Sequence, residues 1–143
     1  MNYLRSRGFT LVELLIVMTM IGLMVVISYV VMMQYADRAK DTAIQMNISN
    51  LRNTAVMIYT EKNSYASLCN PDGTLNDSNP VLKEVEDSVA NITGAAPVCH
   101  AQGKVYCIRT SLFTADYFCI DSTGLAVKQT SQECAANKIR CSP

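Results

Sequence analysis

Glu13 is the only charged residue in an apolar stretch that runs from residue 9 to residue 33. A carboxylate in such a stretch loses water when the stretch enters lipid or a protein core, so it needs a partner or a proton. One interpretation is a plain membrane anchor that tolerates a carboxylate near its end. The other is a functional site, and that interpretation requires a positively charged partner.

A short basic leader precedes the apolar stretch and suggests this partner. Arg5 and Arg7 lead to Gly8, and the apolar stretch is too long for the core of a secretory signal. The processing point that fits the sequence therefore lies before the stretch, between Gly8 and Phe9. Cleavage there would leave the apolar helix on the mature protein with a new amine on Phe9. We predict this amine as the partner of Glu13.

The start of the chain resembles the type IV prepilin family, which includes pilins and the pseudopilins of type II secretion. The resemblance extends from Arg5 to Gly22, and its central stretch reads Gly8-Phe9-Thr10-Leu11-Val12-Glu13-Leu14-Leu15. Many members carry a proline near the middle of the helix, around Val30 here. This chain has none before Pro71, so no proline kink is expected.

The resemblance implies a processing pathway and a set of partners. A prepilin peptidase would cut between Gly8 and Phe9, and the new amine of Phe9 would be methylated. Glu13 would meet the N-terminal amine of a neighbouring subunit during fibre assembly. The implied partners are that peptidase, identical or related subunits, a polytopic platform protein and an assembly ATPase. No cofactor is expected.

Residues 9–33 are long enough to cross a bilayer as a helix, because they span roughly 37 Å against a hydrocarbon core of about 30 Å. The stretch holds 14 Leu, Ile, Val or Phe residues, which favour insertion by roughly 4–8 kcal/mol. Glu13 lies near the interface, where the cost of its charge is below the ~3 kcal/mol of mid-bilayer. Arg5 and Arg7 predict a cytoplasmic N-terminus and a single pass.

The predicted helix continues beyond the membrane stretch, over residues 34–63. Apolar side chains recur there at the spacing of one helical face, at Ile44, Ile48, Leu51, Ala55 and Ile58. We predict that this stripe covers the core of a small globular head at residues 64–143. The four predicted segments are thus the leader (1–8), the membrane and polymerisation segment (9–33), the amphipathic segment (34–63) and the head.

All six cysteines lie in the predicted head, and their even number indicates disulfides. They are Cys69, Cys99, Cys107, Cys119, Cys134 and Cys141. The chain has no Cys-x-x-Cys pair and one histidine, His100, which is expected in a loop. No metal site is therefore expected.

The head is predicted as an antiparallel meander on the long helix, which makes the fold class α+β. Strands are expected at residues 104–110, 117–120 and 125–128, after a short helix that Asn79 caps and Pro80 begins. A hairpin centred on Phe113 would place Cys107 opposite Cys119 and predicts their disulfide. Cys134–Cys141 follows from closeness in sequence and Cys69–Cys99 by exclusion. Four apolar side chains would face the helix: Tyr106, Ile108, Phe118 and Ile120.

No enzyme motif occurs in the chain, and neither a nucleophile elbow nor a phosphate-binding loop is found. The whole chain carries 12 basic and 12 acidic residues, and loss of the leader would leave a formal net charge of −2. Basic residues form no cluster, so nucleic-acid binding has no support.

The sequence therefore predicts a non-enzymatic subunit of a type IV pilus-like filament that assembles through its N-terminal helix. One alternative is a pseudopilin of a type II secretion or DNA-uptake pseudopilus. The other is a membrane-anchored binding module that does not polymerise. The filament subunit is expected first in the cytoplasmic membrane and then in an extracellular pilus or a periplasmic pseudopilus.

Overall fold

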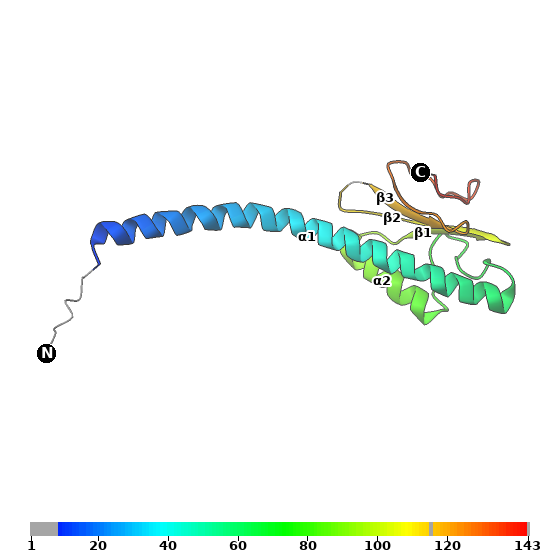
Figure 1. The fold of residues 1–143 in the computed structure, drawn as a ribbon. Coiled ribbons are helices and arrows are strands. Elements are labelled where there is room, and N and C mark those ends of the chain that lie inside the picture. Colours follow the sequence, from blue (N-terminus) through cyan, green and yellow to red (C-terminus); the bar gives the residue numbers. More distant parts are fainter. Residues whose placement is uncertain (1–8, 115, 143) are drawn as a thin grey trace. The chain divides into compact units, whose positions relative to one another are not determined.

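The computed structural model describes residues 9–114 and 116–142. These residues form two helices and four strands (Figure 1), in the order α1 (Leu11–Lys62), α2 (Pro80–Thr93), β1 (Val98–Gln102), β2 (Val105–Ser111), β3 (Tyr117–Asp121) and β4 (Ala126–Gln129). The chain divides into two compact units between Ala36 and Asp37, and each unit is described by itself. The predicted α+β class with a long N-terminal helix is confirmed.

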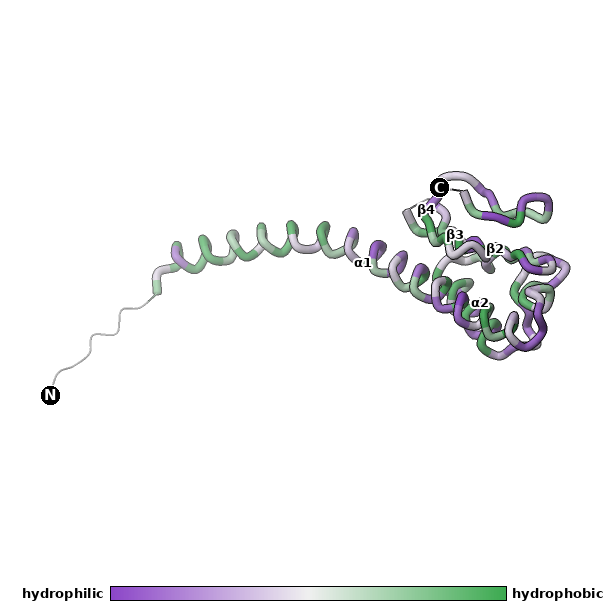
Figure 2. The backbone as a smooth tube through the Cα atoms, turned by 45° about the vertical axis from the view of Figure 1, so that its right-hand side comes forward, coloured by the Kyte–Doolittle hydropathy of each residue, from purple (hydrophilic) through white to green (hydrophobic). Residues whose placement is uncertain are grey.

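The first unit is helical from Leu11 onward, and all its described side chains are exposed. Hydrophobic residues dominate this part of α1, as the colouring of Figure 2 shows. No proline interrupts the helix. The stretch thus has the uninterrupted helical form that the sequence predicts, with an apolar surface on all sides.

The second unit has a core between α1, α2 and the sheet. The predicted stripe on α1 is confirmed, since its five residues are all buried and belong to one cluster with Leu82 and Val89 of α2. In Figure 1 the sheet and α2 both lie alongside this part of α1. Burial of this stripe against the sheet holds the second half of α1 in place.

The short helix α2 begins and ends as the sequence predicts. The Asn79 side chain accepts a hydrogen bond from the Val81 backbone N–H at 3.0 Å, and Pro80 stands at the first helical position. Gly94 ends the helix in a left-handed conformation, with φ 78°. Leu82 and Val89 are buried, which orients the apolar face of α2 toward α1.

The sheet has four antiparallel strands in the order β1-β2-β3-β4, one more than predicted. The additional strand is β1, and it contains His100, so the prediction of a loop there is wrong. Gln102 pairs with Val105, which leaves Gly103 and Lys104 as a two-residue turn. Gly103 takes a φ of 56°, which suits a tight hairpin turn of this length.

The register of the β2–β3 hairpin differs from the prediction by two residues. Cys107 lies opposite Asp121, and Arg109 lies opposite Cys119. A shift of two positions leaves every side chain on its predicted face, because strand side chains alternate with a period of two. Four residues therefore still belong to the core with α1: Tyr106, Ile108, Phe118 and Ile120.

The disulfide prediction is right for one bridge and wrong for two. Cys69 pairs with Cys99, as expected. Cys107 pairs with Cys134 and Cys119 with Cys141, at Cα–Cα distances of 5.7 and 5.8 Å. The shifted register makes Cys107 and Cys119 diagonal neighbours, whose separation of about 7–8 Å exceeds disulfide reach. Each cysteine instead binds the C-terminal segment, residues 130–142, on the outer face of the sheet.

Candidate functional site

Thr10 and Glu13 form a closed pair of contacts at the beginning of α1. The Glu13 Oε2 atom accepts hydrogen bonds from the Thr10 backbone N–H at 2.9 Å and from the Thr10 hydroxyl at 2.8 Å. In return, the Thr10 hydroxyl oxygen accepts from the Glu13 backbone N–H at 3.3 Å. This is a capping box, in which the first residue of the motif and the carboxylate three positions later satisfy each other's groups.

The role of Thr10 was not predicted, although its signal is present in the sequence. A threonine followed three positions later by glutamate, just before an apolar stretch, is the usual sequence form of a capping box. The position also suits the charge, because a helix N-terminus carries a partial positive charge that favours a carboxylate. Glu13 is thus held at the end of the helix by its own chain before any other subunit is considered.

The surroundings of Glu13 leave it accessible to a partner. Glu13 is exposed, and the Phe9 side chain is 78% exposed. Gly8 and the rest of the predicted leader lie outside the described residues. Cleavage between Gly8 and Phe9, methylation of Phe9 and the pairing of its amine with Glu13 therefore remain predictions.

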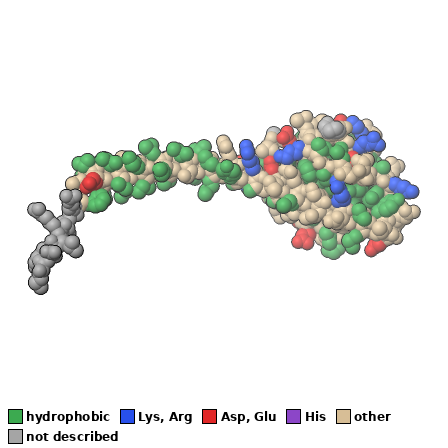
Figure 3. Space-filling model, in the orientation of Figure 1, with side chains coloured by type: hydrophobic (Ala, Val, Ile, Leu, Met, Phe, Trp, Pro, Cys, Tyr) green, Lys and Arg blue, Asp and Glu red, His purple; other side chains and the backbone are tan. Residues whose placement is uncertain are grey.

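The apolar segment, which we define as residues 9–33, has a surface suited to lipid. Its internal hydroxyls are satisfied within the helix: Thr19 donates to the Ile16 carbonyl at 2.8 Å and Ser28 to the Met24 carbonyl at 2.9 Å. Figure 3 shows hydrophobic side chains along this part of the molecule. Among the described residues, α1 is the one helix long and apolar enough to cross a membrane. These features fit a membrane-anchored protein.

Asp41 is a second carboxylate that the sequence analysis did not single out. It is 3% exposed and begins the buried stripe of α1. Its Oδ1 atom accepts from the Phe113 backbone N–H, and its Oδ2 atom accepts from the Thr114 hydroxyl at 2.7 Å. The Lys40 ammonium lies 4.5 Å from the Phe113 ring. Asp41 therefore fixes the β2–β3 loop to α1.

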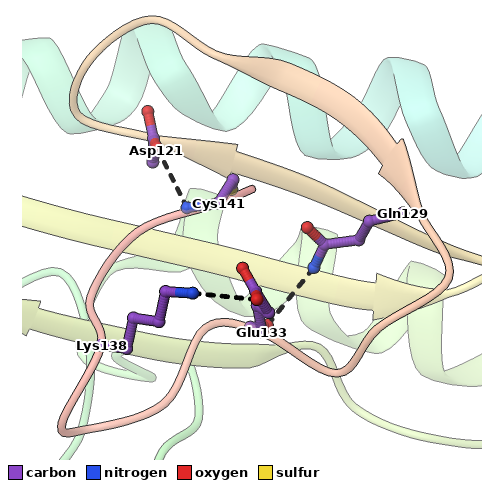
Figure 4. Close-up of polar contacts among 5 residues, drawn as sticks. All are labelled: Asp121, Gln129, Glu133, Lys138 and Cys141. Atoms are coloured by element: carbon purple, nitrogen blue, oxygen red, sulfur yellow. Dashed lines mark hydrogen bonds and ion pairs between the residues drawn. The ribbon is translucent and has the colours of Figure 1, made fainter. Parts of the chain in front are cut away.

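Asp121 holds the C-terminal segment through a hydrogen bond to the Cys141 backbone (Figure 4). It is 1% exposed, and its Oδ2 atom accepts from the Cys141 backbone N–H at 3.0 Å. Within the segment, the Lys138 ammonium donates to Glu133 at 2.9 Å. Hydrogen bonds from Ser142 and Lys138 lower the pKa of Glu133 below its ordinary value. The segment is thus fixed by two disulfides and by polar contacts.

We found no arrangement of catalytic or metal-binding groups in the part of the chain that the structure describes. Residues 9–114 and 116–142 contain no cluster of three or more His, Cys, Asp or Glu side chains placed to hold a metal ion. His100 lines an open cavity of about 300 Å³ beside Cys69 and Ile139. The polar contacts of Asp41 and Asp121 connect elements of the fold to one another.

The comparisons with known proteins agree with the prepilin resemblance. Residues 3–29 match the family model of the prokaryotic N-terminal methylation motif. The chain is also similar to the type IV major pilin protein PilA of Myxococcus xanthus (strain DK1622), with 32% identity over 69 residues. The matched stretch covers 48% of this chain and 31% of that pilin, so the chain spans about a third of its relative's length. No solved structure matches the chain.

Proposed function

We propose that this chain, a member of the type IV prepilin family by its N-terminal motif and its pilin relative, is a structural subunit of a pilus-like filament. The subunit is held in the cytoplasmic membrane by its apolar segment. Assembly removes that segment from lipid and buries it against the same segment of other subunits. The second unit, residues 37–142, which we call the head from here on, contains the predicted head together with the second half of α1 and forms the outer surface of the filament.

The observation that carries this proposal is the combination of a wholly exposed apolar helix with one carboxylate at its beginning. Outside a bilayer, an exposed apolar helix of this length requires burial, and other copies of the chain supply a matching surface. Glu13 is hydrogen-bonded to Thr10, which follows Phe9, the residue that cleavage would make the N-terminus. In a low dielectric, an amine from a neighbouring subunit stabilises such a carboxylate strongly. The pairing also selects the axial position at which a new subunit docks.

The proposed pathway requires partners outside the chain. A prepilin peptidase cuts the Gly8–Phe9 bond, and the new amine of Phe9 is then methylated. A platform protein in the membrane and an assembly ATPase drive extraction, because leaving lipid costs the free energy that insertion provided, roughly 4–8 kcal/mol for the aliphatic and Phe side chains.

The first test is the mass of the mature protein. Intact-mass analysis of the protein purified from its own cells should show loss of residues 1–8 and the gain of one methyl group. Gly8→Ser places a bulkier residue next to the scissile bond, so the uncut precursor should accumulate. A mature protein that still begins at Met1 contradicts the proposal.

The second test separates a filament subunit from an anchored module that does not polymerise. Shearing the cells should release the processed chain in a fraction that sediments at high speed. Release by shearing of intact cells indicates a pilus on the cell surface. A periplasmic pseudopilus is not released in this way. Processed chain that remains entirely in the membrane fraction, also after the outer envelope is opened, favours the anchored module.

A further inference from the structure

The β2–β3 loop presents the one exposed aromatic side chain among the described residues of the head. Phe113 is 45% exposed, whereas the other aromatic residues there are buried or partly buried. Its position is fixed by α1: the Phe113 backbone N–H donates to Asp41 Oδ1 at 2.6 Å, and the Thr114 hydroxyl donates to Oδ2 at 2.7 Å. Single apolar residues are common on protein surfaces, so the place of this one decides what it indicates.

Phe113 lies at the end of the head where the chain arrives from the apolar segment. The head begins at Asp37, and the Lys40 ammonium lies 4.5 Å from the centre of the Phe113 ring. Figure 1 shows the β2–β3 loop beside this part of α1. Seven residues of α1 lead from Met33, the end of the apolar segment, to Lys40, which is roughly 10 Å of helix. The ring is therefore close to the point at which α1 would leave the lipid.

The charged side chains around this ring include cations of the kind found at a membrane surface. Arg38 and Lys40 are exposed, and the stems of such residues cover apolar surface while their charged ends reach water or phosphate. Three carboxylates belong to the same region, those of Asp37, Asp41 and Asp116, so it has no positive excess. A contact with lipid here depends on the aromatic ring and on phosphate, which every phospholipid carries, and not on an anionic surface.

We propose that Arg38, Lys40 and Phe113, which we call the interfacial patch, contact the phospholipid surface of the membrane that holds the apolar segment. This inference rests on the membrane anchoring in the proposed function and adds to it a second point of contact with lipid. The Phe113 ring lies at headgroup level, and the two cations bind lipid phosphate. The patch holds the head in one orientation on the membrane until the subunit is extracted.

The length of the apolar segment favours this contact. As a helix the segment spans roughly 37 Å against a hydrocarbon core of about 30 Å, and a segment longer than the core tilts to fit. A tilted helix lowers one side of the head toward the bilayer. The headgroup zone adds about 5–8 Å on that side, so the helix reaches Lys40 near the outer edge of this zone. Because Asp41 ties the β2–β3 loop to α1, the loop approaches the lipid together with the helix.

A second copy of the chain is the other occupant that an exposed ring would accept. The lipid surface is favoured because the interfacial patch follows, along one helix, the segment that fits a membrane. A lipid contact also forms in a single subunit, whereas a contact between copies requires two. Dilution of the protein in lipid therefore separates the two occupants.

Tryptophan fluorescence tests the contact, because the chain has no tryptophan of its own. Phe113→Trp places the reporter in the interfacial patch. The full chain is reconstituted at high dilution into phosphatidylcholine vesicles, with and without lipid that is brominated near the headgroup end of its acyl chains. We expect bromine to quench the Phe113→Trp emission by roughly twofold or more, since an aromatic ring at headgroup level lies beside it. Equal emission in the two kinds of vesicle overturns the proposal.

Val105→Trp is the matched control. Val105 is 41% exposed and lies at the opposite end of β2, roughly 20 Å from Phe113 along the strand. Bromine should change its emission by less than about a tenth, because that distance keeps it away from the lipid. Equal quenching at the two positions also overturns the proposal. A blue shift of the Phe113→Trp emission that appears only at a high protein-to-lipid ratio identifies a second copy as the occupant and has the same consequence.

A photoactivatable lipid tests the wild-type chain. A phospholipid with a diazirine in its headgroup is mixed into the vesicles, and illumination attaches it to the residues it touches. Trypsin cuts after Arg109, so Val105 and Phe113 fall into different peptides once the disulfides are reduced. We expect roughly fivefold more label in the Phe113 peptide, residues 110–128, because aromatic residues at an interface lie at headgroup level. Equal labelling overturns the proposal, and this result decides if Phe113→Trp fails to form its three disulfides.

The outcomes distinguish this inference from the proposed function. A full chain that an alkaline wash removes from the vesicles contradicts the membrane anchoring on which both rest. An inserted chain with neither quenching nor label at Phe113 contradicts only the interfacial patch. A chain whose interfacial patch touches lipid but that yields no sheared filament contradicts filament assembly and supports the patch.

Discussion

The two units of the molecule are stabilised in different ways. In residues 37–142, three disulfides, a four-stranded sheet and two helices surround a core that belongs to the unit itself. In residues 9–36 every side chain is exposed, and the side-chain hydrogen bonds are local ones, such as those between Thr10 and Glu13. The head thus carries its stability within it, whereas the apolar segment has no core of its own.

This difference separates folding from assembly within one chain. A change in the head should alter the free energy of unfolding. It should lower filament yield only if the head no longer folds. A change in the apolar segment should leave the head folded and alter assembly alone. Each of the following predictions tests one side of that separation.

The largest effect is expected at Glu13. Glu13→Ala removes both the charge and the capping acceptor, so filament yield should fall by at least tenfold while the membrane level stays normal. Glu13→Gln is the sharper variant, because glutamine also serves at this position of a capping box and only the charge is lost. It should be impaired to a similar degree when measured in sheared fractions.

The control for Glu13 is an exposed carboxylate of the head. Glu84→Gln removes a charge from α2 and should assemble as the wild type does. Normal filament yield from Glu13→Gln, together with a reduced yield from Glu13→Ala, would show that assembly needs the capping acceptor and not the charge. That result would rule out the predicted pairing with a Phe9 amine.

The next effect concerns the disulfide between Cys107 and Cys134. Replacing both cysteines by serine should lower the free energy of unfolding of the head by about 2–4 kcal/mol. Thermal denaturation of the full chain in detergent, followed by near-ultraviolet circular dichroism, measures the change. The far-ultraviolet circular dichroism of the helical apolar segment should persist above the transition temperature of the head. Non-reducing peptide mapping is the matching check, and a fragment that joins Cys107 to Cys119 would contradict the pairing.

A smaller loss of stability is expected at Asp41. Asp41→Ala removes a buried charged acceptor from the Phe113 N–H and the Thr114 hydroxyl and should cost about 1–3 kcal/mol. Asp37→Ala is the matched control: Asp37 is exposed and lies 3.8 Å from the Lys40 ammonium, so its loss should stay within about 1 kcal/mol. Chemical denaturation of both variants measures the two values. Equal losses would mean that Asp41 does not fix the β2–β3 loop.

The smallest effect is expected at Glu86. Burial raises the pKa of Glu86 above its ordinary value, although its bond from the Leu75 N–H opposes the shift. A folded-state pKa above the unfolded one means that protonation favours the folded state. This contribution is complete below the unfolded pKa and is lost as pH rises through the folded pKa. Glu86→Gln should therefore reduce the change in melting temperature between pH 4 and pH 7, while Glu84→Gln should not.

Much of the fold was predictable because strong local sequence patterns determine which residues form its elements and its core. The buried stripe on α1, the cap of α2 at Asn79 and the core face of the hairpin all follow from periodicity or from one residue's backbone preference. The core face was right although the register was wrong, since an error of two residues keeps the alternation. These features depend on neighbours in sequence, and a single sequence contains that information.

The features that were missed depend on contacts between distant residues. The register of β2 and β3 is set together with the loop that Asp41 holds, and Asp41 lies 72 residues from Phe113. The pairing of Cys119 with Cys141 requires the path of the C-terminal segment across the sheet, which no local pattern gives. Thr10 is the exception, because its motif was local and was overlooked. A missed strand, β1, belongs to neither group, since it is short and its alternation is weak.

If the head is exported as proposed, the interleaved disulfides have a consequence for the order of events during that step. Taken in chain order, the first two cysteines are native partners, but the next four pair alternately, Cys107 with Cys134 and Cys119 with Cys141. If the head crosses the membrane N-terminus first, Cys107 and Cys119 arrive together before either partner has emerged. Oxidation at that moment would form a non-native disulfide between Cys107 and Cys119. Correct maturation therefore requires that strand pairing precedes oxidation, or that a thiol–disulfide isomerase in the receiving compartment reshuffles the early bond.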